Sequence, residues 1–186
     1  MDQITGLQKC LQHIGTFTLA ELELVAAKCI HRHINKNDYI LQKGEVCNSI
    51  SFLLTGACYE LNAEDTDERI IELYCAGDCI VSPSSFFFQR PAEDPVKAFT
   101  DCEVLTLSVH DLHQLIGVAP VFFQLGKILQ PGWFRVGFYD RGMSPREQYD
   151  HVMTHKPQLV RTFPLKYIAS YLKMTPETLS RIRAAQ

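Results

Sequence analysis

The chain has 186 residues, of which 46% are hydrophobic and 21% are charged, a balance typical of a globular protein with a buried core. No apolar run approaches the roughly 18–20 residues of a membrane span, and the first residues lack the basic and apolar stretches of a secretory signal. We therefore expect a cytoplasmic protein without a membrane partner, and the net charge of −3 argues against one that coats nucleic acid with its whole surface.

The first predicted elements are helices, which extend to about His33. Leu7, Leu11 and Ile14 fall on one helical face. Thr18 is a residue type that caps helix N-termini, and a second apolar stripe at helical spacing follows it. That stripe comprises Leu22, Val25, Ala26 and Cys29. We expect two short helices ahead of the main body of the fold.

From Ile34 to Val109 the pattern changes to short β-rich runs separated by turn residues. The predicted strands are Tyr39–Leu41, Ile50–Leu54, Cys58–Leu61, Ile70–Tyr74, Val96–Phe99 and Val104–Leu107. Because no helical stretch lies between them, parallel crossovers are excluded and an antiparallel arrangement is favoured. The fold class is therefore predicted as α+β, with an antiparallel double-sheet β-roll (jelly roll) and flanking helices.

The cysteines and histidines of the chain do not form a convincing metal site. The seven cysteines are scattered, only Cys75 and Cys79 lie close together, and no CxxC pair exists. We expect free thiols in a reducing compartment. The His31-Arg32-His33 run has the spacing of the ligand pair in cupin enzymes, but the expected glutamate and the second histidine strand are missing. No metal, cofactor or enzymatic activity is predicted.

Helical signals return after Val109, with a short helix over Asp111–Ile116 and a second one beginning at Pro120. An apolar stripe with alternating spacings of three and four follows: Phe122, Leu125, Leu129, Gly132, Val136 and Tyr139. This spacing predicts a long dimer helix that packs on its own copy in a homodimer. The alternative is that the same stripe packs onto the roll. Pro131 should kink or end the helix.

The C-terminal residues 164–185 have the pattern of two short helices joined by a tight turn. Ser144 caps the helix before them and Pro145 suits its first position. Thr175 and Pro176 repeat this pattern, directly after the break that begins at Lys173. The side chains expected to face inward are Ile168, Ala169, Leu172, Leu179 and Ile182. Two helices in this geometry predict a small helix-turn-helix domain.

The outer surface of the second helix carries polar and basic groups. Residues 156–186 have a charge of +5, so the first 155 residues carry −8, which suggests that a polyanion meets the C-terminus. The predicted base-contacting residues are Glu177, Thr178, Ser180, Arg181 and Arg183, and the predicted phosphate-contacting residues are Lys166 and Lys173. The alternative is an amphipathic helical hairpin that packs on another part of the protein.

Two parts of the sequence resemble the Crp/Fnr family of bacterial transcription regulators. IASYLKMTPETLSRIR is similar to the family's helix-turn-helix, and KGEVCNSISFLLTGACYEL with Gly77–Asp78 resembles its β-roll. The resemblance implies a roll sensor domain (1–118), a dimerisation helix (119–143) and a DNA-binding domain (144–186). It assigns base reading to Glu177, Ser180 and Arg181. The implied partners are palindromic double-stranded DNA, a second copy of the chain and, as a further candidate, RNA polymerase.

The sequence departs from this family in two places. The chain stops at Gln186, directly after the second helix, without the β-hairpin wing of winged members. Pro176 stands where many members carry a basic or small residue, so the preferred half-site is expected to differ.

The resemblance also implies where a cyclic nucleotide would bind, and the required residues are missing there. Residues 91–94 (PAED) take the place of the phosphate-binding stretch, which puts Ala92 where an arginine is needed. The turn that usually bears a glutamate becomes 81–84 (VSPS). Cyclic AMP is therefore not expected to bind by the usual contacts. A shifted effector pocket could use Ser82, Ser84, Ser85 and Arg90 for an unknown small molecule, or these residues form a plain surface turn.

A sequence-specific DNA-binding regulator is thus the leading hypothesis. The alternative is an effector-binding or protein-interaction module with a degenerate DNA-binding end, which the low overall basicity and the missing wing favour.

Overall fold

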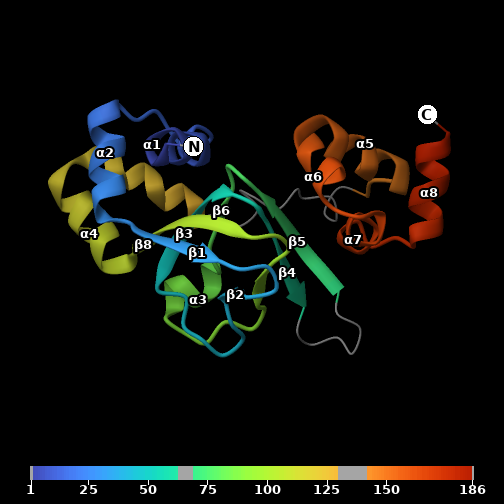
Figure 1. Cartoon of the computed structure of the whole chain (residues 1–186), viewed down its shortest axis with the longest axis horizontal. Coiled ribbons are helices and arrows are strands. Elements are labelled where there is room, and N and C mark those ends of the chain that lie inside the picture. Colours follow the sequence, from blue (N-terminus) through green and yellow to red (C-terminus); the bar gives the residue numbers. More distant parts are fainter. Residues whose placement is uncertain (1, 63–68, 130–141, 186) are drawn as a thin grey trace.

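A computed structural model describes residues 2–62, 69–129 and 142–185 of the chain. In this part of the chain, two antiparallel sheets of four strands each form a β-roll, with helices on two sides (Figure 1). The first sheet has the order β1-β8-β3-β6 and the second has the order β2-β7-β4-β5. The strands are β1 (Ile30–Ile34), β2 (Tyr39–Leu41), β3 (Ser49–Thr55), β4 (Ala57–Asn62), β5 (Arg69–Cys75), β6 (Cys79–Ile80), β7 (Val96–Ala98) and β8 (Cys102–Ser108). This confirms the predicted double-sheet roll.

The register of the first sheet decides which side chains share a face. Ser51 on β3 lies opposite Thr106 on β8, while Arg32 on β1 lies opposite Val104. Because side chains alternate between faces along a strand, these four point to one face of the sheet. The residues before and after them in each strand point to the other face, where Phe52 is fully buried.

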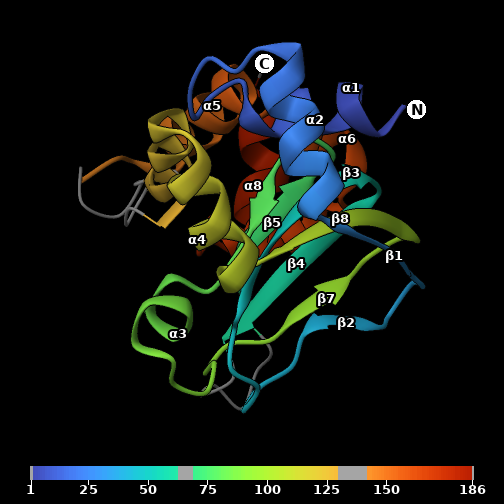
Figure 2. The ribbon, with the colours of Figure 1, turned by 90° about the vertical axis from the view of Figure 1, so that its left-hand side faces the viewer.

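Helices cover that other face of the first sheet (Figure 2). They are α1 (Gln3–Leu11), α2 (Leu19–Lys28), α4 (Val109–Val118) and the 3₁₀ helix η1 (Pro120–Leu129). The predicted cap is confirmed at Thr18, which forms a capping box with Glu21, and Ser108 caps α4. The apolar residues of these four helices join Ile50 and Phe52 of β3 in one buried cluster, the roll core. None of the described helices is long and apolar enough to cross a membrane.

The N-terminal boundary differs from the prediction. Helix α2 ends at Lys28 instead of continuing to about His33, and Ile30–Ile34 forms strand β1 paired along its length with β8. The helical pattern of this segment is short, and the hydrogen-bond ladder with β8 outweighs local helix propensity. Strand β6 and helix α3 (Pro83–Phe88) were also not predicted, and α3 replaces the expected surface turn at the serines.

The segment expected to begin a long dimer helix has a different geometry. Pro120–Leu129 is a 3₁₀ helix, and Phe122, Leu125 and Ile128 are its buried residues. Their spacing of three matches the three residues per turn of this helix type, so Ile128 takes the place predicted for Leu129. All three belong to the roll core, as the alternative of packing on the roll requires. Residues 130–141, including Pro131 and Val136, lie outside the described residues.

Four helices at the C-terminus form a second unit beside the second sheet (Figure 1). They are α5 (Pro145–His155), α6 (Pro157–Thr162), α7 (Leu165–Tyr171) and α8 (Pro176–Ala184). The expected Ser144 cap is confirmed, with Glu147 completing a capping box and Pro145 in the first turn. Helices α6 and α7 contact β5, the edge strand of the second sheet. The four helices and the outer face of β4–β5 share one buried apolar cluster, the C-terminal core.

Candidate functional site

Helices α7 and α8 are held at a fixed angle by a tight turn and an apolar contact. Lys173 adopts a left-handed conformation with a φ of 52°, and the amide of Met174 donates to the carbonyl of Ala169 at 2.9 Å. The hydroxyl of Thr175 then accepts from the amide of Thr178 at 3.2 Å, which confirms the predicted cap. Four of the five residues expected to face inward are buried (Ile168, Ala169, Leu172 and Leu179), and Ile182 is partly buried.

The predicted DNA-contacting residues lie on the opposite side of this helix pair. Four of the five predicted residues on α8 are exposed: Glu177, Ser180, Arg181 and Arg183. Thr178 is partly buried, and its hydroxyl accepts from Nη2 of Arg181 at 3.4 Å. Helix α8 lies on the far side of the C-terminal helices from the sheets, so the roll does not cover it (Figure 1).

The two predicted phosphate-binding lysines are also exposed. Lys166 lies at the start of α7, where its Nζ is 5.4 Å from the centre of the Tyr167 ring. Lys173 lies in the turn before α8. The exposed basic side chains are thus spread over the helix pair, with Arg181 and Arg183 in the last turn of α8. An exposed carboxylate, Glu177, lies in the first turn of that helix. Such a surface can present bidentate donors and one acceptor to the edges of base pairs.

The C-terminal helices dock on the roll through aromatic and apolar contacts. Phe99 lies 4.9 Å from Phe163 and 5.1 Å from Tyr167 between ring centres, and Tyr167 also meets Tyr59 edge-on at 5.4 Å. A hydrogen bond also crosses the contact, from the amide of Ile70 on β5 to the hydroxyl of Ser170 on α7 at 2.9 Å. Because that amide lies on the edge strand, the hydroxyl satisfies a donor that would otherwise need water.

A buried cluster of charged groups lies in the same contact. Nζ of Lys156, between α5 and α6, is 4.0 Å from Oε1 of Glu72 on β5 and 3.9 Å from Oδ1 of Asp78. The Glu72 side chain is 1% exposed, and burial raises its pKa to about 7 although Lys156 acts in the opposite direction. Among the described residues, Nζ of Lys156 has no hydrogen-bond partner. The sequence analysis did not identify this cluster, because its members are more than 75 residues apart at the extremes.

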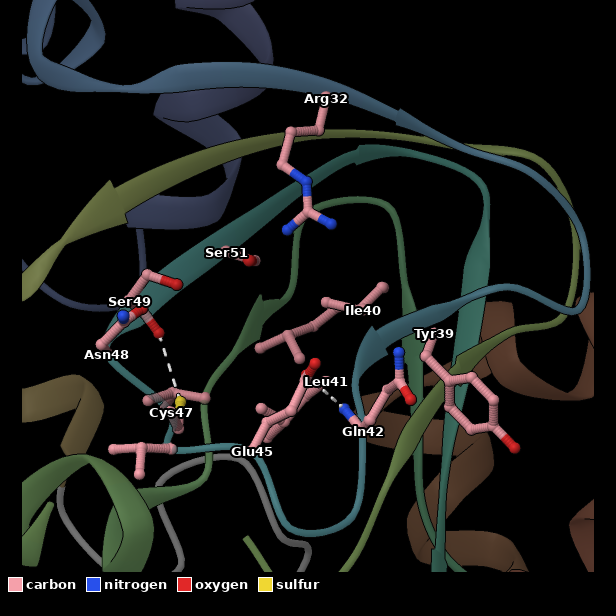
Figure 3. Close-up of a pocket in the computed structure, with 13 residues that line it drawn as sticks. Arg32, Tyr39, Ile40, Leu41, Gln42, Glu45, Cys47, Asn48, Ser49 and Ser51 are labelled. Carbon is pink, nitrogen blue, oxygen red and sulfur yellow. Dashed lines mark hydrogen bonds between the residues drawn. The ribbon is translucent and has the colours of Figure 1, made fainter. Parts of the chain in front are cut away.

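A pocket of about 560 Å³ opens on the roll between β1, β2 and β3 (Figure 3). Arg32 of β1 extends over it, Ser49 and Ser51 of β3 line one wall, and Ile40 and Leu41 of β2 line another. The remaining lining residues are Tyr39, Gln42, Glu45, Val46, Cys47, Asn48, Ile80 and Val81. The volume lies in the range of small-molecule sites.

The four residues predicted for an effector pocket do not line this pocket. Ser85 is buried, accepts from the amide of Cys47 at 2.9 Å and donates to the carbonyl of Arg90, so it fixes the loop. Arg90 itself turns away, with its guanidinium carbon 4.9 Å from the centre of the Phe88 ring. Ser82 is partly buried at the start of α3, and Ser84 is exposed on that helix.

The interior of the second sheet carries acidic groups that the sequence analysis did not consider. The Tyr74 hydroxyl donates to Oε2 of Glu60 at 2.9 Å, and both side chains are buried. Ala92, at the expected arginine position, is also buried. A phosphate at the Ala92 position would therefore find no guanidinium from this residue. Elsewhere in the described residues, the cysteines are free thiols, and no three His, Cys, Asp or Glu side chains are grouped as metal ligands.

Comparisons with known proteins agree with this architecture. Residues 31–117 match the cyclic nucleotide-binding domain family. The catabolite activator protein of Thermus thermophilus is 18% identical, with a TM-score of 0.60 over 93% of this chain and 85% of that one. FixK2 of Bradyrhizobium japonicum is 18% identical, with a TM-score of 0.64 over 84% and 83%. A CooA variant from Carboxydothermus hydrogenoformans is 14% identical, with a TM-score of 0.60 over 87% and 77%. A search of curated proteins finds no match.

Proposed function

We propose that this protein is a DNA-binding transcription regulator of the Crp/Fnr type, in which α7 and α8 form a helix-turn-helix. The observation that carries the proposal is the exposed face of α8, which includes Glu177, Ser180 and Arg181, on a helix that the roll does not cover. In the major groove, Arg181 would donate two bonds to guanine and Glu177 would accept from cytosine. The fold shared with the catabolite activator protein supports this reading.

In this proposal, residues 1–118 form the sensor domain, residues 144–186 the DNA-binding domain, and residues 119–143 connect them in a homodimer on a palindromic site. Phe122 and Leu125 are already buried in the roll core, so they are not available to a partner. Val118 and Phe123 are 68% and 66% exposed, and they are the apolar side chains that we assign to the second copy. RNA polymerase as a further partner stays a prediction.

We also propose that cyclic AMP does not control this regulator through the usual contacts. The buried Ala92 offers no guanidinium to a cyclic phosphate, and the side chains buried in the second sheet include the carboxyl group of Glu60. Arg90 does not replace the missing arginine, since its side chain lies over Phe88.

The test is selection of binding sites from randomised duplex DNA at two salt concentrations. The wild-type chain should enrich a palindrome, and Arg181→Ala should lose about 1–3 kcal/mol and relax one base position of each half-site. Lys166→Ala should weaken binding to all DNA sequences alike. It should also reduce the slope of log affinity against log salt concentration by about one. Arg90→Gln, a charge change on the roll, is the matched control and should bind like the wild type. If no sequence is enriched at either salt, the interaction-module hypothesis is favoured instead.

A further inference from the structure

The pocket on the roll has a permanently charged group at its mouth. Figure 3 shows the side chain of Arg32 leaving β1 with its guanidinium directed toward the pocket. A guanidinium stays protonated in proteins and carries five donors in a planar fork. Among the described residues, Arg32 has no hydrogen bond or ion pair. All five donors are therefore open to a ligand.

The sheet register explains why Arg32 has no carboxylate partner. Both carboxylate oxygens of Glu103, on the neighbouring strand β8, contact a histidine. Oε2 lies 2.8 Å from Nε2 of His31, and Oε1 lies 2.6 Å from Nδ1 of His33. These histidines flank Arg32 in the sequence, so their side chains leave β1 on the opposite face. The histidines on either side of Arg32 thus bind the neighbouring carboxylate, and the Arg32 side chain points toward the pocket without a carboxylate partner.

Small hydroxyl side chains leave space opposite the guanidinium. Ser49 and Ser51 lie two residues apart on β3 and share the face of Arg32. Ser51 is 4% exposed, and its hydroxyl meets only a long contact of 3.4 Å with Thr106. Both hydroxyls can donate to an oxyanion.

The other walls suit the body of a small organic molecule. Ile40, Ile80 and Val81 provide apolar surface. The single acidic lining residue, Glu45, is fixed by the amide of Gln42, which donates to its Oε2 at 2.9 Å. Such a combination of an apolar wall and a few convergent polar groups is typical of ligand sites.

We propose that this pocket binds a small molecule bearing a carboxylate or phosphate group, with Arg32 as the anion-binding residue and Ser49 and Ser51 as further donors. The site differs from the position that the cyclic nucleotide-binding resemblance assigns to phosphate, because Ala92 is not among the lining residues. It is a property of the roll and does not depend on DNA binding.

The test is calorimetric titration of the full chain, without DNA and at constant ionic strength, using succinate, glycerol 3-phosphate and cyclic AMP as separate probes. Succinate and glycerol 3-phosphate distinguish a carboxylate from a phosphate ligand. Two variants probe the site: Arg32→Gln removes the charge, and Ser51→Val removes a hydroxyl and fills space. Arg90→Gln is the matched control, because it removes an exposed arginine outside the pocket.

We expect at least one of the two acyclic probes to saturate, with binding weakened about tenfold or more by Arg32→Gln. Ser51→Val should weaken it several-fold, and Arg90→Gln should leave it unchanged. The proposal is overturned if neither acyclic probe saturates up to about 10 mM, which is weaker than the useful range of such sites. It is also overturned if the Arg90→Gln variant no longer binds a probe, cyclic AMP included, that the Arg32→Gln variant still binds. Because no DNA is present, either result is independent of the DNA-binding proposal.

Discussion

The two sides of the roll are covered by helices in different ways. On the side of the first sheet, the roll core is closed by side chains such as Phe122 and Leu125, which are 0% exposed. On the side of the second sheet, the C-terminal helices bury Leu73 and Leu159 but also enclose Glu72 and Lys156. Buried charges and an interface hydrogen bond are more typical of contacts between domains than of a single core.

From this difference we expect the first side to stay closed while the chain is folded, and the second side to open more readily. Opening an apolar core costs free energy in proportion to the apolar surface that becomes exposed to water. A contact with buried charges regains solvation of those charges when it opens, so its net stability is smaller. Movement of the C-terminal helices relative to the roll would move α8, the proposed recognition helix.

The largest expected effect on stability comes from a substitution in the roll core. Phe122→Ala removes a fully buried ring that stacks on Phe17 with 6.5 Å between ring centres. We expect the free energy of unfolding of the roll to fall by about 3–5 kcal/mol. Hydrogen exchange read by peptide should show a larger loss of protection in β3 and β8 than in α7 and α8. Equal losses in all four elements would mean that the two sides unfold as one unit.

A smaller effect, dependent on pH, is expected in the charged cluster. Burial raises the pKa of Glu72 to about 7, so the folded state keeps a proton there that the unfolded state has already lost. The stability due to this group is therefore highest at low pH and falls as the pH rises from about 4.5 to about 7. Glu72→Gln should flatten this part of the stability curve.

Lys156→Met sharpens the same test, because it removes the cation between Glu72 and Asp78. We expect a loss of about 1–3 kcal/mol at pH 8, where Glu72 is ionised, and a much smaller loss at pH 5. Urea unfolding at four pH values, followed by circular dichroism, measures both variants. Arg146→Met, which breaks an exposed ion pair with Asp150, is the control and should show no such pH dependence. A loss of the same size at pH 5 and pH 8 would exclude Glu72 as the titrating group.

The smallest expected effect is the loss of the hydrogen bond across the contact. Ser170→Ala leaves the amide of Ile70 without its partner on α7, at a cost of about 1 kcal/mol. Exchange of the Ile70 amide should become faster, while amides of β3 should be unaffected. Ser180→Ala, an exposed serine on α8, provides the comparison and should leave both rates unchanged.

Much of the fold could be predicted from the sequence because its signals are local. Thr18, Ser144 and Thr175 cap helices as expected, since a cap needs only a side-chain oxygen and the amides that follow it. The strands after Ile34 were predicted because turn residues separate them at regular intervals. For the same reason the outward position of Glu177 and Arg181 on α8 followed from helical spacing.

The candidate sites were predicted only in part. The exposed face of α8 was expected, but the pocket lined by Arg32 and the serines of β3 was not. The effector site at Ser82, Ser84, Ser85 and Arg90 stays a prediction. The alternation of Ser49, Ile50, Ser51 and Phe52 was a usable signal, since it places small polar residues on one face of a buried strand. It could not reveal Arg32, which approaches from a different strand.

The sequence by itself therefore determined most of the strands, three helix caps and the polar face of α8. Tertiary structure alone decided that Ile30–Ile34 pairs with β8, that Phe122, Leu125 and Ile128 pack on the roll at a spacing of three, and that Lys156 meets Glu72. The first group depends on contacts within a few residues, which propensity and periodicity describe. The second depends on contacts between segments far apart in the chain, whose free energy exceeds the local preferences of either segment.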